Sequence, residues 1–126
     1  MTEFIKSRIA SFRYAFHGWW YVIGSQKNAW IHAAASVCVL IFGLWLALPA
    51  RDWAALVIVI AMVWSAEFFN TSIEAVVDLA SPTHHPLAKV GKDVGAAAVL
   101  IAASAAVLVG LLILGPPLWA KIASLF

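Results

Sequence analysis

Residues 94–115 read VGAAAVLIAASAAVLVGLLILG and contain no charged side chain. A helix needs roughly 20 predominantly apolar residues to cross the hydrocarbon core of a bilayer, so this stretch predicts a membrane span. The whole composition agrees, because 64% of the 126 residues are hydrophobic and only 11% are charged, against about 45–50% and about 25% in soluble domains. We therefore expect an integral membrane protein.

Two further spans are predicted before this one. Residues 29–49 form an apolar run without Asp, Glu, Lys or Arg, and residues 53–80 form a second run with acidic residues in its last half. We expect the third span to comprise residues 86–115 and to stop before Pro116 and Pro117, since a proline has no backbone N–H to give to a helix in lipid.

The N-terminal residues 1–25 predict an amphipathic helix that lies on the membrane surface. Large apolar residues recur there at helical spacing, and basic residues take other positions. The apolar set is Phe4, Ile5, Ile9, Phe12, Phe16 and Trp20, and the basic set is Lys6, Arg8 and Arg13. The predicted fold class is thus all-α integral membrane: a single domain, residues 1–126, with a surface helix and three transmembrane helices.

The distribution of basic residues predicts the orientation. Three spans put the N-terminal segment and the second loop on the same side of the membrane, with six Lys or Arg, and leave Arg51 and Lys121 on the other. Short loops rich in Lys and Arg stay cytoplasmic, so we expect the N-terminus and the second loop there. The formal charge of +2 gives no support to a nucleic-acid partner.

Four of the six acidic residues, Glu67, Glu74, Asp78 and Asp93, gather in one short region. At about 100° per residue, Glu67, Asn70, Glu74 and Asp78 project within roughly an 80° stripe of one helix. A carboxylate inside a bilayer is costly, so the stripe is expected to face protein, water or a ligand. One interpretation is purely structural, with the polar groups hydrogen-bonded to neighbouring helices.

A second interpretation is chemical. Carboxylates at the cytoplasmic end of a span can hold a divalent cation and accept a proton from a hydroxyl, and Lys92 can neutralise phosphate oxygens. These are the parts that phosphoryl transfer requires. The chain has no GxxxxGK[ST] or GxGxxG loop, so a nucleotide would not be held as in P-loop enzymes or protein kinases.

Residues 67–78, EFFNTSIEAVVD, resemble the signature E-x-x-N-[ST]-[AS]-I-E-x-x-x-D of the prokaryotic diacylglycerol kinase and undecaprenol kinase family. The resemblance continues through HPLAK at residues 85–89 and KDVGAAAV at residues 92–99. It implies a homotrimer in the bacterial inner membrane with active sites shared between subunits. It also implies transfer of the γ-phosphate of Mg-ATP to a lipid hydroxyl, with Mg²⁺ and ATP required.

The resemblance also implies roles for single residues. Glu67 would be the catalytic base and Asn70 would orient the lipid hydroxyl, so both would contact the lipid substrate. Glu74 would bind the metal and the nucleotide. The remaining nucleotide-site residues would be Tyr14, Asp78, Lys92 and Asp93.

One position departs from the family pattern. Where family members usually have a metal-binding Glu near the end of the surface helix, this chain has Gln26. A glutamine carbonyl can bind a cation but brings no charge, so the number of metal ions is open. His32, in the first span, is expected to be a buried, hydrogen-bonded residue rather than a ligand.

The lipid substrate is the other open point. The loop SPTHHPLAK, residues 81–89, looks more like the undecaprenol kinase branch than the diacylglycerol kinase branch, so undecaprenol is the expected substrate and diacylglycerol the alternative. A different class of function, a non-enzymatic membrane subunit or a cation-conducting oligomer lined by the acidic stripe, is also considered, because rings of carboxylates select cations.

Overall fold

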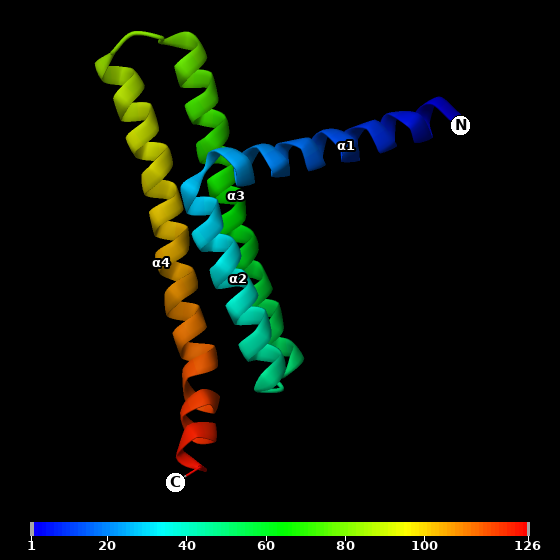
Figure 1. Cartoon of the computed structure of the whole chain (residues 1–126), viewed down its shortest axis with the longest axis vertical. Helices are drawn as coiled ribbons and strands as arrows, with labels where there is room; N and C mark the ends of the chain where they lie inside the picture. The colour runs from blue at the N-terminus through cyan, green and yellow to red at the C-terminus, as the bar shows by residue number, and fades with distance from the viewer. Residues whose placement is uncertain (1, 126) are drawn as a thin grey trace.

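The computed structural model describes residues 2–125, which form four α-helices and no strand (Figure 1). Helix α1 spans Thr2–Ser25, α2 spans Lys27–Trp45, α3 spans Ala50–Ala80 and α4 spans Pro86–Ala123. Helices α2, α3 and α4 are each long and apolar enough to cross a membrane. The predicted all-α membrane fold with three apolar spans is confirmed.

Helix α3 lies at the centre of the arrangement. It runs antiparallel to α4 along much of its length, α2 packs beside it, and α1 leaves the other three helices crosswise (Figure 1). Most of the buried side chains belong to α3, and many large apolar side chains of all four helices are exposed. Such surfaces suit a lipid environment or contact with other protein chains. The buried residues of α3 are Leu56, Val63, Glu67, Asn70 and Thr71.

A single non-helical residue separates α1 from α2. Gln26 is extended, with φ −104° and ψ 118°, and its position as N-cap of α2 redirects the chain. The C-terminal part of α1 is held on α3 by Trp19, whose ring centroid lies 4.8 Å from those of Trp64 and Phe68. Val22 is buried at the same junction. These aromatic contacts fix where α1 leaves the bundle.

The connection from α2 to α3 is a tight helix ending. Ala47 has a positive φ of 52°, and the bonds Leu48 N to Gly43 O and Ala47 N to Leu44 O form the pair that closes many helices at a left-handed residue. This ending stops α2 at Trp45, short of the expected residue 49. Because Pro49 then caps the next helix, α3 begins at Ala50 rather than at residue 53.

Helix α4 does not end before its two prolines, and the expected end at residue 115 is wrong for the helix. It starts with Pro86 in its first turn, where no N–H is needed, and continues through Pro116 and Pro117 to Ala123. The prolines remove two intrahelical hydrogen-bond donors, but the part of α4 beyond them contacts the end of α2. Lys121 Nζ donates to the backbone oxygen of Trp45 at 3.1 Å and lies 4.4 Å from the centroid of that indole ring.

We predict that Lys121→Met loosens the end of α4 without changing the rest of the fold. The substitution keeps the side chain's length but removes both the hydrogen bond and the cation–π contact, together worth about 1–2 kcal/mol. Backbone amides after Pro117 should exchange with deuterium several-fold faster. Lys27→Met is the control, and unchanged exchange after Pro117 in Lys121→Met would contradict this role.

Candidate active site

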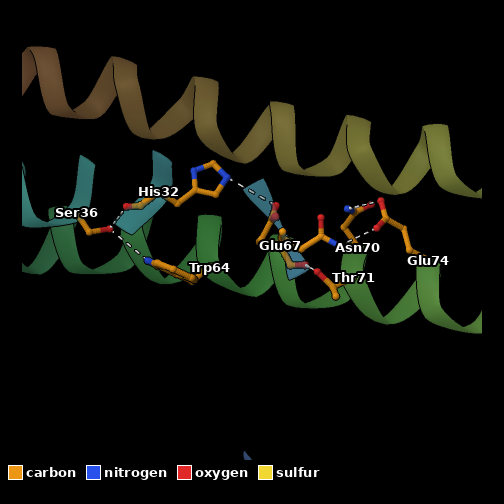
Figure 2. A network of polar contacts seen from close by, with 8 residues as sticks. His32, Ser36, Trp64, Glu67, Asn70, Thr71 and Glu74 are labelled. Atoms are coloured by element: carbon orange, nitrogen blue, oxygen red, sulfur yellow. Dashed lines mark hydrogen bonds and ion pairs between the residues drawn. The ribbon is translucent and has the colours of Figure 1, made fainter. Parts of the chain in front are cut away.

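The polar face of α3 changes from buried to exposed along the helix. Glu67 is 0% exposed and Asn70 is 6% exposed, whereas Glu74 is half-buried and Asp78 is exposed. Figure 2 shows Glu67, Asn70 and Glu74 following one another along α3. The stripe therefore joins the interior of the bundle to the end of α3 that meets the α3–α4 loop.

Close packing of α4 on α3 buries the middle of this stripe. At Gly95 of α4, a Cβ atom would lie only 2.5 Å from Asn70 Oδ1. A side chain at residue 95 would therefore displace either the helix or the amide of Asn70. The absence of a side chain at Gly95 therefore leaves room for the amide of Asn70, whereas the backbone of Asn70 lies at an ordinary contact distance of 3.8 Å from that Cβ position.

Two amides hold the carboxylate of Glu74. Gln26 donates from Nε2 to Glu74 Oε2 at 2.9 Å, and Asn70 donates from Nδ2 to Glu74 Oε1 at 3.2 Å (Figure 2). The first bond joins the α1–α2 junction to α3, and the second lies within α3. Gln26, which departs from the acid usual in the resembled family, thus contacts the carboxylate for which the resemblance implies a metal-binding role.

The carboxylate of Glu67 is buried without a hydrogen-bond partner. Neither of its oxygens has one among residues 2–125, although Thr71 Oγ1 donates to the backbone oxygen of Glu67 at 2.8 Å. The nearest charged or titratable group is His32 of α2, whose Nε2 lies 3.7 Å from Glu67 Oε2. A buried carboxylate with free acceptor positions is costly and marks this point as a functional candidate.

His32 is held in place by aromatic and polar neighbours. Its ring meets that of Trp64 edge to face at a centroid distance of 6.4 Å. Trp64 in turn donates from Nε1 to Ser36 Oγ at 3.2 Å, and Ser36 donates to the backbone oxygen of His32 at 2.7 Å. Burial of His32 was expected, but its Nε2 has no hydrogen-bond partner among the described residues.

Charged pairs lie farther along α3 and α4. Lys92 Nζ of α4 lies 2.5 Å from Asp78 Oδ1 of α3, so this pair crosses between the helices. Asp93 pairs with Lys89 on its own helix. The Lys89–Asp93 pair is exposed, whereas in the other pair Asp78 is exposed and Lys92 is half-buried; such pairs at a surface contribute little to stability and can exchange partners for a charged ligand.

Tyr14 is not brought to the acidic residues within one chain. It lies on α1, is 63% exposed, and contacts the guanidinium of Arg13 at 5.5 Å from the ring centroid. Figure 1 shows the N-terminal part of α1 extending away from the other helices. The site that one chain assembles contains Gln26, Glu67, Asn70, Glu74 and, farther out, the Lys92–Asp78 pair.

The donor set fits magnesium only in part. Residues 2–125 contain no cluster of three His, Cys, Asp or Glu side chains placed to hold a metal ion. Mg²⁺, however, is commonly bound by one or two carboxylates together with water and substrate phosphates. Glu74 supplies one half-buried carboxylate, and the carbonyl oxygen of Gln26 supplies a neutral ligand if the amide turns.

An apolar groove begins beside His32. It has a volume of about 470 Å³ and lies between α2, α3 and α4. Along α2 its lining extends from Ile31 to Leu46, which corresponds to about 22 Å at 1.5 Å per residue. His32 therefore belongs both to the groove and to the surroundings of Glu67.

Sequence reasoning missed the relation between His32 and Glu67. Helical periodicity groups residues of one helix, whereas these two side chains come from α2 and α3. The available signal was a single histidine in an apolar span, opposite a span that carries a buried acid.

Comparison with known proteins identifies the family of this chain. Residues 13–114 match the family model described as prokaryotic diacylglycerol kinase. The chain belongs to this family. Membership in the prokaryotic diacylglycerol kinase family makes it a lipid kinase and implies ATP use, which disfavours both the non-enzymatic subunit and the cation-conducting oligomer.

Curated relatives carry both expected names. The undecaprenol kinase of Bacillus subtilis is 41% identical over 94% of this chain and 93% of its own length. The diacylglycerol kinase of Synechocystis is 43% identical over 87% of this chain and 63% of its own length. The diacylglycerol kinase of Escherichia coli K12 is 38% identical over 65% of this chain and 73% of its own length.

We predict that Gly95→Ala disturbs the site while Gly91→Ala does not. At residue 95 the new methyl group meets Asn70 Oδ1, whereas at residue 91 the nearest atom is Val77 Cγ2 at an ordinary 3.7 Å. Overpacking should lower the free energy of unfolding by about 1–3 kcal/mol, and Gly91→Ala should be neutral or stabilising through helix propensity. Reversible unfolding in detergent measures both, and equal stabilities would contradict the close approach.

Proposed function

We propose that this lipid kinase transfers the γ-phosphate of Mg-ATP to the primary hydroxyl of undecaprenol. The observation that carries the proposal is the fully buried Glu67, whose carboxylate oxygens have no hydrogen-bond partner among residues 2–125. In a lipid kinase, an acceptor of this kind inside an apolar span suits the proton of a lipid hydroxyl.

In the proposed reaction, Glu67 accepts the proton of the lipid hydroxyl. The hydroxyl oxygen then bonds to the γ-phosphorus as the bond from that phosphorus to the β,γ-bridging oxygen breaks, and ADP leaves. Asn70 orients the hydroxyl, and its contact with Glu74 ties the hydroxyl end of the site to the phosphate end.

The nucleotide is proposed to lie at the exposed end of the stripe. Glu74 and Gln26 would hold Mg²⁺, which neutralises phosphate charge when bound. Lys92, now paired with Asp78, would contact phosphate oxygens, and Asp93 would lie beside it.

Undecaprenol is favoured over diacylglycerol on two grounds. The B. subtilis relative that aligns over 94% of this chain is named an undecaprenol kinase. The groove that begins at His32 follows α2 from Ile31 to Leu46, or about 22 Å, which exceeds one leaflet of a hydrocarbon core about 30 Å thick. A single long isoprenoid chain suits such a groove better than two acyl chains.

We further propose a homotrimer in the bacterial inner membrane, with the N-terminus and the α3–α4 loop in the cytoplasm. The six basic residues on that side support the orientation. Tyr14 lies on the projecting α1, so it would contact the nucleotide of a neighbouring subunit.

We predict that Glu67→Gln abolishes phosphoryl transfer but leaves the fold intact. The amide has the same shape but is a far weaker proton acceptor, so kcat should fall by at least about 100-fold. Stability should be unchanged or higher, because an unpaired buried charge is removed. The assay is transfer of labelled γ-phosphate in mixed micelles, with the exposed acid Glu3→Gln as control.

The same assay tests the substrate when undecaprenol and diacylglycerol are supplied separately. Faster labelling of undecaprenol is expected. Faster labelling of diacylglycerol would overturn the substrate assignment, and full turnover by Glu67→Gln would remove Glu67 from the role of base.

We predict that Gln26→Glu strengthens magnesium binding. A second carboxylate beside Glu74 adds charge to the donor set and repels Glu74 unless a cation lies between them. The free Mg²⁺ concentration for half-maximal activity should fall about tenfold at saturating ATP. Asn28→Asp, which adds the same charge at a nearby exposed residue, should leave it unchanged; an identical Mg²⁺ dependence in both variants would exclude Gln26 from the metal site.

A further inference from the structure

His32 and Glu67 face each other from different helices; Glu67 is buried and His32 is half-buried. The His32 side chain is 13% exposed and that of Glu67 is 1% exposed. Their closest polar atoms, Nε2 and Oε2, are 3.7 Å apart, slightly too far for a hydrogen bond. In Figure 2 the His32 ring points toward the Glu67 carboxylate.

The unpartnered atoms of this region lie together. The buried side-chain atoms without a hydrogen-bond partner among residues 2–125 are His32 Nε2, Glu67 Oε1, Glu67 Oε2 and Asn70 Oδ1. Most buried polar atoms in proteins have partners. An imidazole N–H donates a hydrogen bond and a carboxylate accepts one. Among these residues, His32 is therefore the one on another helix that can donate to Glu67. A small movement would bring Nε2 and Oε2 within hydrogen-bond distance.

The contacts behind His32 hold its ring toward Glu67. Trp64 packs edge to face on the imidazole, and its own indole N–H is tied to Ser36 of α2. Ser36, Trp64 and His32 thus form a chain of contacts that ends at the Glu67 carboxylate. Catalytic bases are commonly oriented by a third group in this way.

We propose that His32 is a positioning residue for Glu67. Its Nε2–H holds Oε2 as the substrate binds, which leaves Oε1 to receive the proton of the lipid hydroxyl. The contact tightens in the substrate complex, as catalytic hydrogen bonds that are long in the free enzyme often do. This inference rests on the proposed function of Glu67 as base.

Two substitutions at residue 32 separate positioning from packing. His32→Leu fills the space without a donor, and His32→Gln keeps an N–H donor near the position of Nε2. Positioning predicts that Leu lowers kcat by about 10- to 100-fold, the scale of one hydrogen bond to a charged group. For His32→Gln, kcat should stay within about threefold of that of the unchanged protein, and the Kd for ATP should stay within about twofold in both variants.

A merely structural role predicts the opposite order, since His32 also lines an apolar groove in which leucine packs better than glutamine. Thermal unfolding of each variant and of His84→Phe, an exposed histidine in the α3–α4 loop, provides the comparison. An unchanged kcat in His32→Leu, or equal losses in both variants, would overturn the proposal. Full activity of Glu67→Gln would instead overturn the proposed function, whatever the result at residue 32.

Trp64→Phe gives a second test, because Trp64 is expected to act through His32. Alone it should lower kcat several-fold, and in the His32→Leu background it should lower it no further. If the two substitutions instead lower kcat by independent factors that multiply, Trp64 does not act through His32.

Discussion

The carboxylate of Glu67 is fully buried in the interior of the helical bundle. Glu67 lies in the middle of a helix that is apolar enough to span a membrane. An acid in this place lowers the stability of the fold and makes membrane insertion less favourable. Helices α2 and α4 pack on α3 around Glu67. The contacts that stabilise the folded bundle are made by other residues. Such a cost is understandable where the acid does chemistry.

The buried part and the exposed part of the polar face of α3 suit different roles. Glu67 and Asn70 are buried, and Glu67 faces His32 at the start of the apolar groove, whereas Glu74, Asp78 and Lys92 lie toward the end of the bundle. A lipid hydroxyl arrives from the apolar side and a nucleotide from water, so a helix with a buried and an exposed end can bring them together. Asn70 lies between the buried Glu67 and the more exposed residues of the stripe. The position of its amide depends on the absence of a side chain at Gly95.

Much of this was predictable from the sequence because it follows from composition and helical periodicity. Apolar length predicts the spans, and a spacing of three, four and four residues places the polar groups of α3 on one face. Contacts between helices were not predictable in this way: the approach of His32 to Glu67 and the bond from Gln26 to Glu74 depend on tertiary packing. The contact of Lys121 with Trp45, beyond the prolines of α4, is likewise a tertiary contact between residues far apart in the sequence.

The most direct test is an experimental structure of the protein in a lipid nanodisc with undecaprenol, Mg²⁺ and a non-hydrolysable ATP analogue. We expect the lipid hydroxyl oxygen to lie within hydrogen-bond distance of a Glu67 carboxylate oxygen, with the isoprenoid chain in the groove beside α2 and the γ-phosphate analogue facing the hydroxyl. A hydroxyl that lies away from Glu67, with the carboxylate still enclosed and unpartnered, would contradict this expectation.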